Sequence, residues 1–344
     1  MIGFGLAAGE GTRLRPLTRV TPKPLLAPAG RPLIDLAVEA LLAAGATRVV
    51  VNAHHGADQL AAHLAGRPEV EVVVEPVLLG TGGGLVNAAH LGLLGGGADP
   101  VLVTAADHVV DPGDLAALAG LLDRSGAPMV AGLIPAAGDA FGLRLVGAGG
   151  PAAGRQVVRD PAGLWDSAGA YAVRAGMLAD LEPGPATLVG RVLGPLLARG
   201  DLVGLPFRGP VADAGTLARL LRVSADLLAG RWSYALPPGR LSGRPGPGLE
   251  PPAVGGWPGE DNSGAGPVFV AEGAKVDPAA VLAGPVVVDA GARVGAGAVV
   301  TRAVVGPGAV VGPGATVAGS FLGPGAELAA GESAAAALVP GPSP

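Results

Sequence analysis

The sequence predicts an α/β domain with a mostly parallel central sheet, followed by a β-helix. From residue 2 to about residue 230, short runs rich in Val and Leu alternate with Ala- and Leu-rich segments of helical period, which is typical of βαβ units. From residue 236 to 267 the chain is crowded with Pro and Gly, a composition that cannot pack a core and indicates a linker. Beyond that stretch, apolar residues recur every six positions, which indicates the coils of a β-helix.

The composition excludes several classes of protein. The chain has 344 residues, which is room for two domains of ordinary size. Charged residues make up 15% of it and the net charge is −5, so it offers no broad basic field for nucleic acid and no polybasic tail for a membrane surface. It contains no cysteine, which excludes disulfides, Cys-ligated zinc, iron–sulfur clusters and a thiol nucleophile.

Two apolar stretches could be mistaken for membrane or export signals. The first, at the N-terminus, has no basic region ahead of it, so we expect no signal peptide and a cytoplasmic protein. The second, residues 76–98, contains no Asp, Glu, Lys or Arg and is long enough to span a bilayer. Its glycines, Asn87 and His90 argue against a span, and we predict a loop and a helix there instead.

The first domain should contain five strands and five helices that the local pattern resolves. The strands are predicted at 2–7, 48–52, 71–74, 101–105 and 129–133, each of the length of a buried strand. The helices are predicted at 33–44, 57–64, 84–94, 114–122 and 216–229. Asp114 and Thr216 supply the N-cap chemistry that the last two helices need.

The second domain is predicted from its six-residue period. Small residues follow each of its regularly spaced apolar positions, which are Val276, Leu282, Val288, Val294, Val305, Val311 and Val317. In a β-helix these apolar residues point into a narrow core and Gly/Pro pairs turn the corners. The alternative is an unstructured Ala/Gly tail. We therefore place an α/β domain at 1–233, a linker at 234–267, a β-helix at 268–330 and a tail at 331–344.

The strongest chemical signal is the Gly-rich segment 6–26, which leaves the first predicted strand. Backbone N–H groups from Gly9 to Thr12 can cradle phosphate oxygens, and Arg13, Arg15 and Lys23 can neutralise their charge. The segment matches neither the Walker pattern nor GxGxxG. A phosphate site is the prediction, and a plain strand-to-loop turn is the alternative.

Residues 9–18 (GEGTRLRPLT) and 22–25 (PKPL) resemble the signature of the sugar-1-phosphate nucleotidyltransferases. The resemblance implies a Rossmann-like nucleotidyltransferase domain followed by a left-handed β-helix. It also implies that a sugar-1-phosphate oxygen attacks the α-phosphorus of an NTP and that pyrophosphate leaves with the help of Mg²⁺. Arg13 would then contact the triphosphate, and Lys23 would lie beside the α-phosphate.

Further segments resemble other parts of that family. Residues 75–84 (EPVLLGTGGG) resemble the loop that lines the nucleobase and sugar pocket, and the alternative is a flexible turn before a helix. The resemblance implies a nucleotide site made of Leu6, Ala7, Ala8, Gly9, Gly11, Thr12, Gly80, Thr81 and Gly82. It implies sugar contacts at Gly142 and Gly169, and it makes Asp107 and Asp213 ligands of Mg²⁺, a cation that prefers few protein ligands. Taken singly, each aspartate could equally be a cap or turn residue.

The chain also departs from the family pattern. Residues 159–161 read Arg-Asp-Pro where many members have Glu-Lys-Pro, and Arg191 lies where an acidic residue is frequent. These departures favour a non-catalytic regulatory subunit as one alternative to the enzyme. Within the enzyme class the segments most resemble mannose-1-phosphate guanylyltransferases, and uridylyl- and thymidylyltransferases remain open.

The second domain carries its own expectations. No histidine follows His108, so the β-helix lacks the usual base of an acyltransferase. We expect it to mediate a homo-oligomer. Because every candidate catalytic residue precedes the linker, we also expect a truncation after about residue 236 to bind nucleotide.

Overall fold

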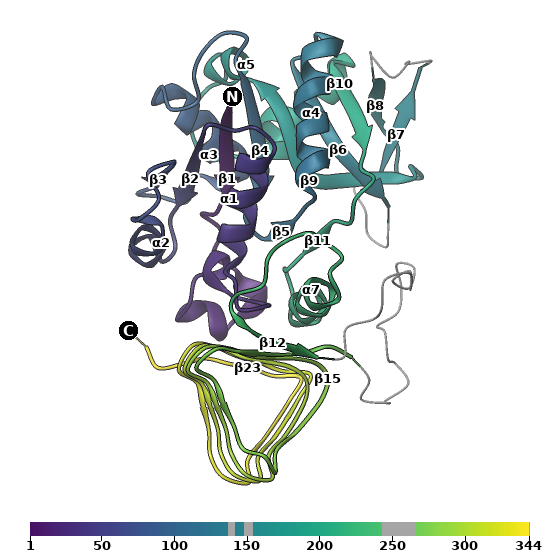
Figure 1. Ribbon diagram of the computed structural model, residues 1–344. Coiled ribbons are helices and arrows are strands. Elements are labelled where there is room, and N and C mark those ends of the chain that lie inside the picture. The colour runs from purple at the N-terminus through teal and green to yellow at the C-terminus, as the bar shows by residue number, and fades with distance from the viewer. Residues whose placement is uncertain (137–141, 148–153, 243–265, 344) are drawn as a thin grey trace. The chain divides into compact units, whose positions relative to one another are not determined.

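A computed structural model describes residues 1–136, 142–147, 154–242 and 266–343 (Figure 1). The chain forms two compact units. The sheet unit consists of residues 1–9 and 34–211, and the coil unit consists of residues 10–33 and 212–344. Most of the predicted linker, residues 243–265, lies outside the described residues.

A mixed sheet forms the centre of the sheet unit, and its strand order is β3-β2-β1-β4-β9-β6-β10-β8-β7. Its strands are β1 (Ile2–Leu6), β2 (Arg48–Ala53), β3 (Val70–Val74), β4 (Pro100–Ala105), β6 (Met129–Pro135), β7 (Leu143–Val146), β8 (Arg155–Arg159), β9 (Trp165–Arg174) and β10 (Leu202–Pro206). Parallel pairing joins β3, β2, β1 and β4, whereas β9 runs antiparallel to both β4 and β6. The five predicted strands are confirmed. The predicted parallel arrangement holds for β3, β2, β1 and β4 and for the pair β6 and β10, whereas β9 and β8 run in the opposite direction, so the sheet as a whole is mixed.

Helices follow the strands in the order that βαβ units require. They are α1 (Leu33–Ala43), α2 (Ala57–Leu64), α3 (Gly80–His90), α4 (Pro112–Ser125), α5 (Ala175–Ala179), the π-helical turn η4 (Val189–Leu193) and α6 (Gly194–Arg199). The short strand β5 (His108–Val109) lies between β4 and α4. Two predictions were wrong in detail. The helix α3 begins at Gly80 instead of Gly84, and the N-cap of α4 is Asp111, whose carboxylate accepts from the Gly113 N–H, instead of Asp114.

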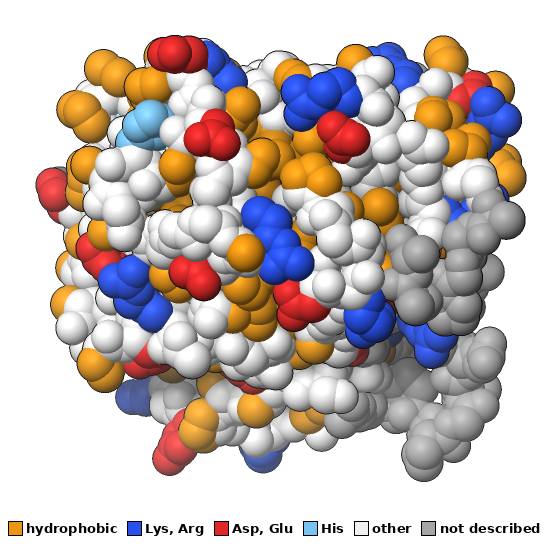
Figure 2. Space-filling model, turned by 90° about the horizontal axis from the view of Figure 1, so that it is seen from above, with side chains coloured by type: hydrophobic (Ala, Val, Ile, Leu, Met, Phe, Trp, Pro, Cys, Tyr) orange, Lys and Arg blue, Asp and Glu red, His pale blue; other side chains and the backbone are white. Residues whose placement is uncertain are grey.

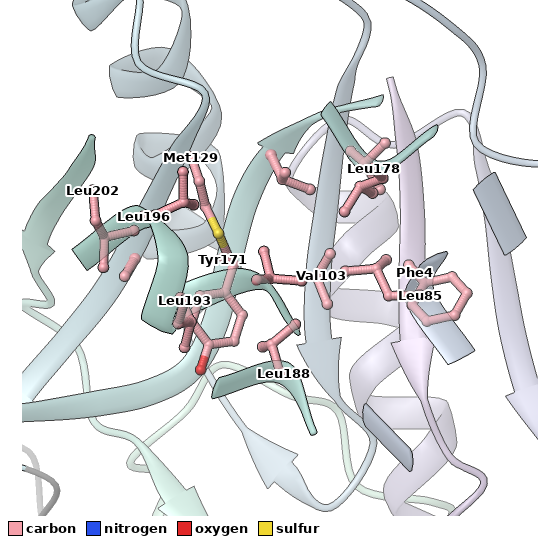
Figure 3. Close-up of a cluster of buried hydrophobic side chains, with 14 of the residues drawn as sticks. Phe4, Leu85, Val103, Met129, Tyr171, Leu178, Leu188, Leu193, Leu196 and Leu202 are labelled. Carbon is pink, nitrogen blue, oxygen red and sulfur yellow. The ribbon is translucent and has the colours of Figure 1, made fainter. Parts of the chain in front are cut away.

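One apolar cluster holds the elements of the sheet unit together. Figure 3 shows Phe4 of β1, Val103 of β4 and Tyr171 of β9 among the side chains of α3, α5, η4 and α6. Phe4 and Val103 are fully buried. Burial of an apolar side chain of this size stabilises the fold by about 1.5–3 kcal/mol, so this cluster fixes the strand ends that carry the site.

Parallel coils form most of the coil unit, and in Figure 1 their projection is triangular. Their strands are β13 (Val268–Ala271), β14 (Lys275–Val276), β15 (Val281–Val288), β16 (Arg293–Val294), β17 (Val299–Val305), β18 (Val310–Val311), β19 (Thr316–Ala318), β20 (Phe321–Leu322), β21 (Glu327–Leu328), β22 (Ser333–Ala335) and β23 (Leu338–Val339). Val281 pairs with Val299, which pairs with Thr316, which pairs with Ser333. The same edge therefore recurs after 18 or 17 residues, and Val and Ala fill the interior.

The rest of the coil unit consists of the helix α7 (Leu217–Ala229), the strands β11 (Ala212–Asp213) and β12 (Gly239–Ser242), and three 3-10 turns. The turns are η1 (Thr12–Leu14), η2 (Leu17–Arg19) and η3 (Lys23–Leu25). Thr216 caps α7 as predicted, because its hydroxyl accepts from the Arg219 N–H at 3.3 Å. The strand β12 pairs antiparallel with β13, so this part of the predicted linker is ordered structure attached to the coils.

Among the described residues, no helix has both the length and the apolar character that a bilayer span needs. Residues 80–90 of the charge-free stretch form α3. Figure 2 shows basic and acidic side chains interspersed with apolar ones on the face that it draws.

Candidate functional site

The carboxyl ends of β1 and β4 form a topological switch point in the sheet unit. After β1 the chain builds β2 and β3 on one side, and it then crosses to build β4 on the other side of β1. The Ala106 N–H donates to the Leu6 carbonyl at 3.0 Å, which joins the two strand ends. Ligands of open α/β sheets bind at such a point, and the predicted residues Leu6 to Gly9 and Asp107 lie there.

The backbone that follows β1 is held by a buried polar network. The Asn52 Oδ1 accepts from the Ala7 N–H at 2.8 Å, and the Asn52 amide donates to the Glu75 Oε1 at 2.7 Å. The Glu75 Oε2 accepts from the Leu79 N–H at 3.0 Å. Asn52 and Glu75 are each 2% exposed. The network therefore ties the ends of β1, β2 and β3 to the start of α3, and it occupies the Ala7 N–H.

Ala8 and Gly9 complete the predicted turn. Ala8 is buried, whereas Gly9 is exposed, and a Cβ at Gly9 would meet nothing within 4 Å. Of Ala7, Ala8 and Gly9, only Gly9 is open to close approach by a ligand.

The glycine run of α3 packs against the chain itself. A Cβ at Gly80 would lie 2.7 Å from the Ala186 carbonyl oxygen, and one at Gly82 would lie 2.4 Å from the Thr187 carbonyl oxygen. The Gly82 N–H donates to the Ala186 carbonyl at 2.9 Å, and the Thr81 hydroxyl accepts from the Leu188 N–H at 2.9 Å. The expectation that these glycines admit a ligand is thus incomplete, because Gly80 and Gly82 admit the backbone of 186–188 and the Gly82 N–H is already used.

Asp107 and Gly169 come together through a histidine. The His108 Nδ1 lies 2.8 Å from the Asp107 Oδ1, and both side chains are partly exposed. Gly169 has a φ of +70°, and a Cβ there would lie 2.9 Å from the His108 Nε2. The His108 ring therefore occupies the space that the missing side chain of Gly169 leaves, while it donates to one oxygen of Asp107.

Gly142 is also enclosed by protein. Its φ is +71°, and a Cβ there would lie 2.4 Å from the Asp160 carbonyl oxygen. The Asp160 N–H donates to the Gly142 carbonyl at 3.1 Å. A glycine is required here because Asp160, just after β8, comes close to the residue before β7. The predicted sugar contact of Gly142 stays a prediction.

The signature loop of the coil unit folds around Gly11. Gly11 has a φ of +62°, and its carbonyl accepts from the Leu14 N–H at 2.9 Å and from the Thr18 hydroxyl at 2.9 Å. A Cβ at Gly11 would lie 3.1 Å from the Cβ of Lys23. Lys23 is 7% exposed, whereas Thr12 and Arg13 are exposed. The loop thus packs the stem of one predicted cation and presents the other to solvent.

Arg13 and Asp213 lie side by side at Gly215. A Cβ at Gly215 would lie 2.6 Å from the Asp213 Oδ1 and 2.7 Å from the Arg13 Nη2. The Gly215 N–H donates to the Asp213 Oδ1 at 2.8 Å, and the Arg219 guanidinium pairs with the Asp213 Oδ2. The coil unit therefore brings two predicted residues together, with Arg219 as a neighbour that competes for the carboxylate.

The two predicted metal ligands suit a hard cation that also takes ligands from phosphate and water. Within the part of the chain that the structure describes, no cluster of three or more Asp, Glu or His side chains could hold a metal. Asp107 and Asp213 are carboxylates, the oxygen donors that Mg²⁺ prefers, and Mg²⁺ sites commonly combine one or two carboxylates with phosphate and water. The two aspartates belong to different units. Both carboxylates are chemically suited to Mg²⁺. That they bind one shared ion stays a prediction.

Comparisons with known proteins identify the family. A sequence model of the nucleotidyl transferase family matches residues 3–140. A mannose-1-phosphate guanylyltransferase of Mycobacterium tuberculosis is 32% identical over 87% of this chain and 78% of its own length. The chain belongs to the sugar-1-phosphate nucleotidyltransferase family. The similarity extends over most of both units.

Other family members match about a third of the chain. An N-acetylmuramate alpha-1-phosphate uridylyltransferase of Caulobacter vibrioides is 44% identical over 31% of this chain. A bifunctional protein GlmU of Pelotomaculum thermopropionicum is 39% identical over 36% of it. The matches span only 46% and 25% of the lengths of these relatives.

A solved structure gives the fold of this family member. It is named as a glucose-1-phosphate thymidylyltransferase from Bacillus anthracis, and it superposes with a TM-score of 0.56 and 21% identity over 65% of this chain and 94% of its own. At that identity the likeness shows the fold alone.

Sequence reasoning missed four residues that shape the site of this sugar-1-phosphate nucleotidyltransferase family member: Asn52, Glu75, His108 and Arg219. Asn52 ends an apolar strand, and a polar residue at that place is a signal that could have been used. Arg219 gives no such signal, because an arginine at an exposed position in the first turn of a helix is ordinary.

Proposed function

We propose that the protein transfers a nucleotidyl group from an NTP to a sugar-1-phosphate, giving an NDP-sugar and pyrophosphate, and that GDP-mannose is the product. One observation carries this proposal, namely the similarity to a mannose-1-phosphate guanylyltransferase over 87% of the chain. In the reaction, an oxygen of the sugar-1-phosphate forms a bond to the α-phosphorus. The bond from the α-phosphorus to the bridging oxygen breaks, and that oxygen leaves with pyrophosphate.

The roles of the residues follow from their charge and burial. Exposed Arg13 binds the triphosphate, and Lys23, held by the Gly11 turn, stabilises the charge at the α-phosphate. Gly9, with open space around it, lets phosphate oxygens approach the backbone. Asp107 and Asp213 are the proposed ligands of Mg²⁺, which supplies charge neutralisation on the phosphates when bound.

One observation favours a second candidate for the nucleobase and the sugar. The uridylyltransferase relative has the higher identity, 44% over 115 residues, although it matches a smaller share of the chain. A uridylyl transfer to another sugar-1-phosphate is therefore the second candidate.

A matrix of GTP, UTP, dTTP and ATP against mannose-, glucose- and N-acetylmuramate-1-phosphate, read by pyrophosphate release, distinguishes the candidates. GTP with mannose-1-phosphate should give the highest kcat/KM. UTP as the preferred nucleotide would favour the second candidate. If no pair releases pyrophosphate while the protein still binds an NDP-sugar, the chain is a regulatory subunit instead.

The coils are proposed as a left-handed β-helix that joins copies of the chain. The parallel register of their strands and the six-residue apolar period support this architecture. Light scattering of the full chain tests the assembly, since a monomeric mass would contradict it.

A further inference from the structure

The signature loop is built into the same compact unit as the C-terminal coils. Residues 10–33 group with residues 212–344, although about 200 residues separate them in the sequence. Three attachments hold the loop and the segment after it, at a coil turn, at the coil face and at α7. Each lies within the coil unit.

The first attachment is the packing of the Leu17 side chain against Gly323. Leu17 of η2 is fully buried, and a Cβ at Gly323 would lie 2.6 Å from the Leu17 Cδ1. The next nearest atoms to that Cβ, the Gly341 nitrogen and the Val339 oxygen, are 3.4 Å away. Gly323 has no left-handed backbone that would require glycine, since its φ is not in that range. The absence of a side chain at Gly323 therefore makes room for Leu17, because the other neighbouring atoms would tolerate a Cβ there.

The other attachments lie at the end of the loop. A Cβ at Gly30 would lie 2.8 Å from the Pro237 Cγ and 3.3 Å from the Oδ1 of Asp289, the residue that follows β15. The Ser224 hydroxyl of α7 donates to the Pro28 carbonyl. The segment is thus held at Leu17 by the coil turn, and at Pro28 and Gly30 by α7, Pro237 and the turn after β15.

The contact at Gly323 leads directly to the residues of the nucleotide site. Leu17 precedes Thr18, whose hydroxyl bonds the Gly11 carbonyl. Gly11 in turn packs against the Cβ of Lys23. A shift of Leu17 would therefore move the turn that presents Arg13 and the stem that holds Lys23.

We propose that the coil turn at Gly323 is the seat of the signature loop, and that Leu17 and Gly323 are positioning residues for the nucleotide site. The proposal rests on the proposed function for its catalytic consequence. The coils are then part of the site's support, in addition to their proposed role in assembly. The expectation that a truncation after residue 236 binds nucleotide is withdrawn, because that truncation removes the seat.

The test is a pair of reciprocal substitutions. Gly323→Ala places a methyl group against the Leu17 Cδ1 while every atom of the coils stays at least 3.4 Å away. We expect amide hydrogen exchange in residues 10–26 to become about tenfold faster, and kcat/KM for the NTP to fall about 10- to 100-fold, because small displacements at a site are costly. In a Leu17→Ala background the clash is gone, so adding Gly323→Ala should change either quantity less than about twofold.

The control variant is Glu327→Ala, an exposed position on the same coil, which should change neither readout. Leu17→Ala alone unseats the loop without touching the coils and should also speed exchange in residues 10–26. Unchanged exchange in both Gly323→Ala and Leu17→Ala would overturn the proposal. An effect of Gly323→Ala that persists in full in the Leu17→Ala background would also overturn it, because the damage would then lie in the coils. Hydrogen exchange needs no substrate, so a failure of the proposed function is read separately by the activity assay.

Discussion

Replacing Asn52 with Ala should destabilise the sheet unit by several kcal/mol. The substitution removes the acceptor of the Ala7 N–H and the donor to the Glu75 Oε1, at a place where Asn52 and Glu75 are each 2% exposed. A buried polar group left without a partner costs about 1–3 kcal/mol, and more if it is charged. Two such groups give a loss of roughly 3 kcal/mol or more, which is a large fraction of an ordinary domain's stability.

Urea unfolding followed by circular dichroism measures this loss. The matched control is Gln156→Ala, which also removes a side-chain carboxamide, but from an exposed position. There the Gln156 amide donates to the Gly200 carbonyl at 2.6 Å. The control should change the free energy of unfolding by no more than about 0.5 kcal/mol. A loss below about 1 kcal/mol for Asn52→Ala would refute the reasoning, because it would mean that water or a rearrangement satisfies both groups.

Three further substitutions test other parts of the site and its support. Lys23→Met keeps the buried stem and removes the charge, so kcat should fall about 10²–10³-fold with little change in melting temperature; near-normal turnover would contradict the role of Lys23. Arg219→Met removes the competitor for Asp213, so half-maximal activation and Mn²⁺ binding should need roughly two- to fivefold less metal, the small effect expected of an exposed ion pair; an unchanged requirement would contradict it. Burial raises the pKa of Asp289 above its ordinary 3.8, so the folded state is favoured by protonation and loses stability as the pH rises through the folded pKa. Asp289→Asn should therefore raise the melting temperature at pH 7, with an advantage that disappears below about pH 4, and an advantage independent of pH would rule out this cause.

Much of the sheet unit could be predicted from periodicity, and the misses have physical causes. The strand at 48–53 and the helix at 57–64 follow simple apolar patterns. The start of α3 was missed because Gly80 to Gly84 have low intrinsic helix propensity, and the energy that makes them helical comes from contact with residues 184–188. A tertiary contact of this kind leaves no local pattern.

Site residues that lie close together in the sequence could be predicted, whereas contacts between residues far apart in the sequence were missed. Arg13, Arg15 and Lys23 lie in one short segment, so residue types and spacing indicated them together, and the resemblance to the family then singled out Arg13 and Lys23. The contact between Leu17 and Gly323 joins residues some 300 positions apart, and glycines recur at so many coil turns that Gly323 gave no special signal. For the same reason, the pairing of Arg219 with Asp213 emerged only from the fold.

The most direct test of the proposed reaction is the stoichiometry of its two products. Purified full-length protein is incubated with GTP, mannose-1-phosphate and Mg²⁺, and GDP-mannose and pyrophosphate are quantified by mass spectrometry and an enzymatic assay. Nucleotidyl transfer predicts equal amounts of both, formed about 10²–10³-fold more slowly by Lys23→Met. Pyrophosphate without an NDP-sugar, or no product from any NTP and sugar-1-phosphate pair, would contradict the account.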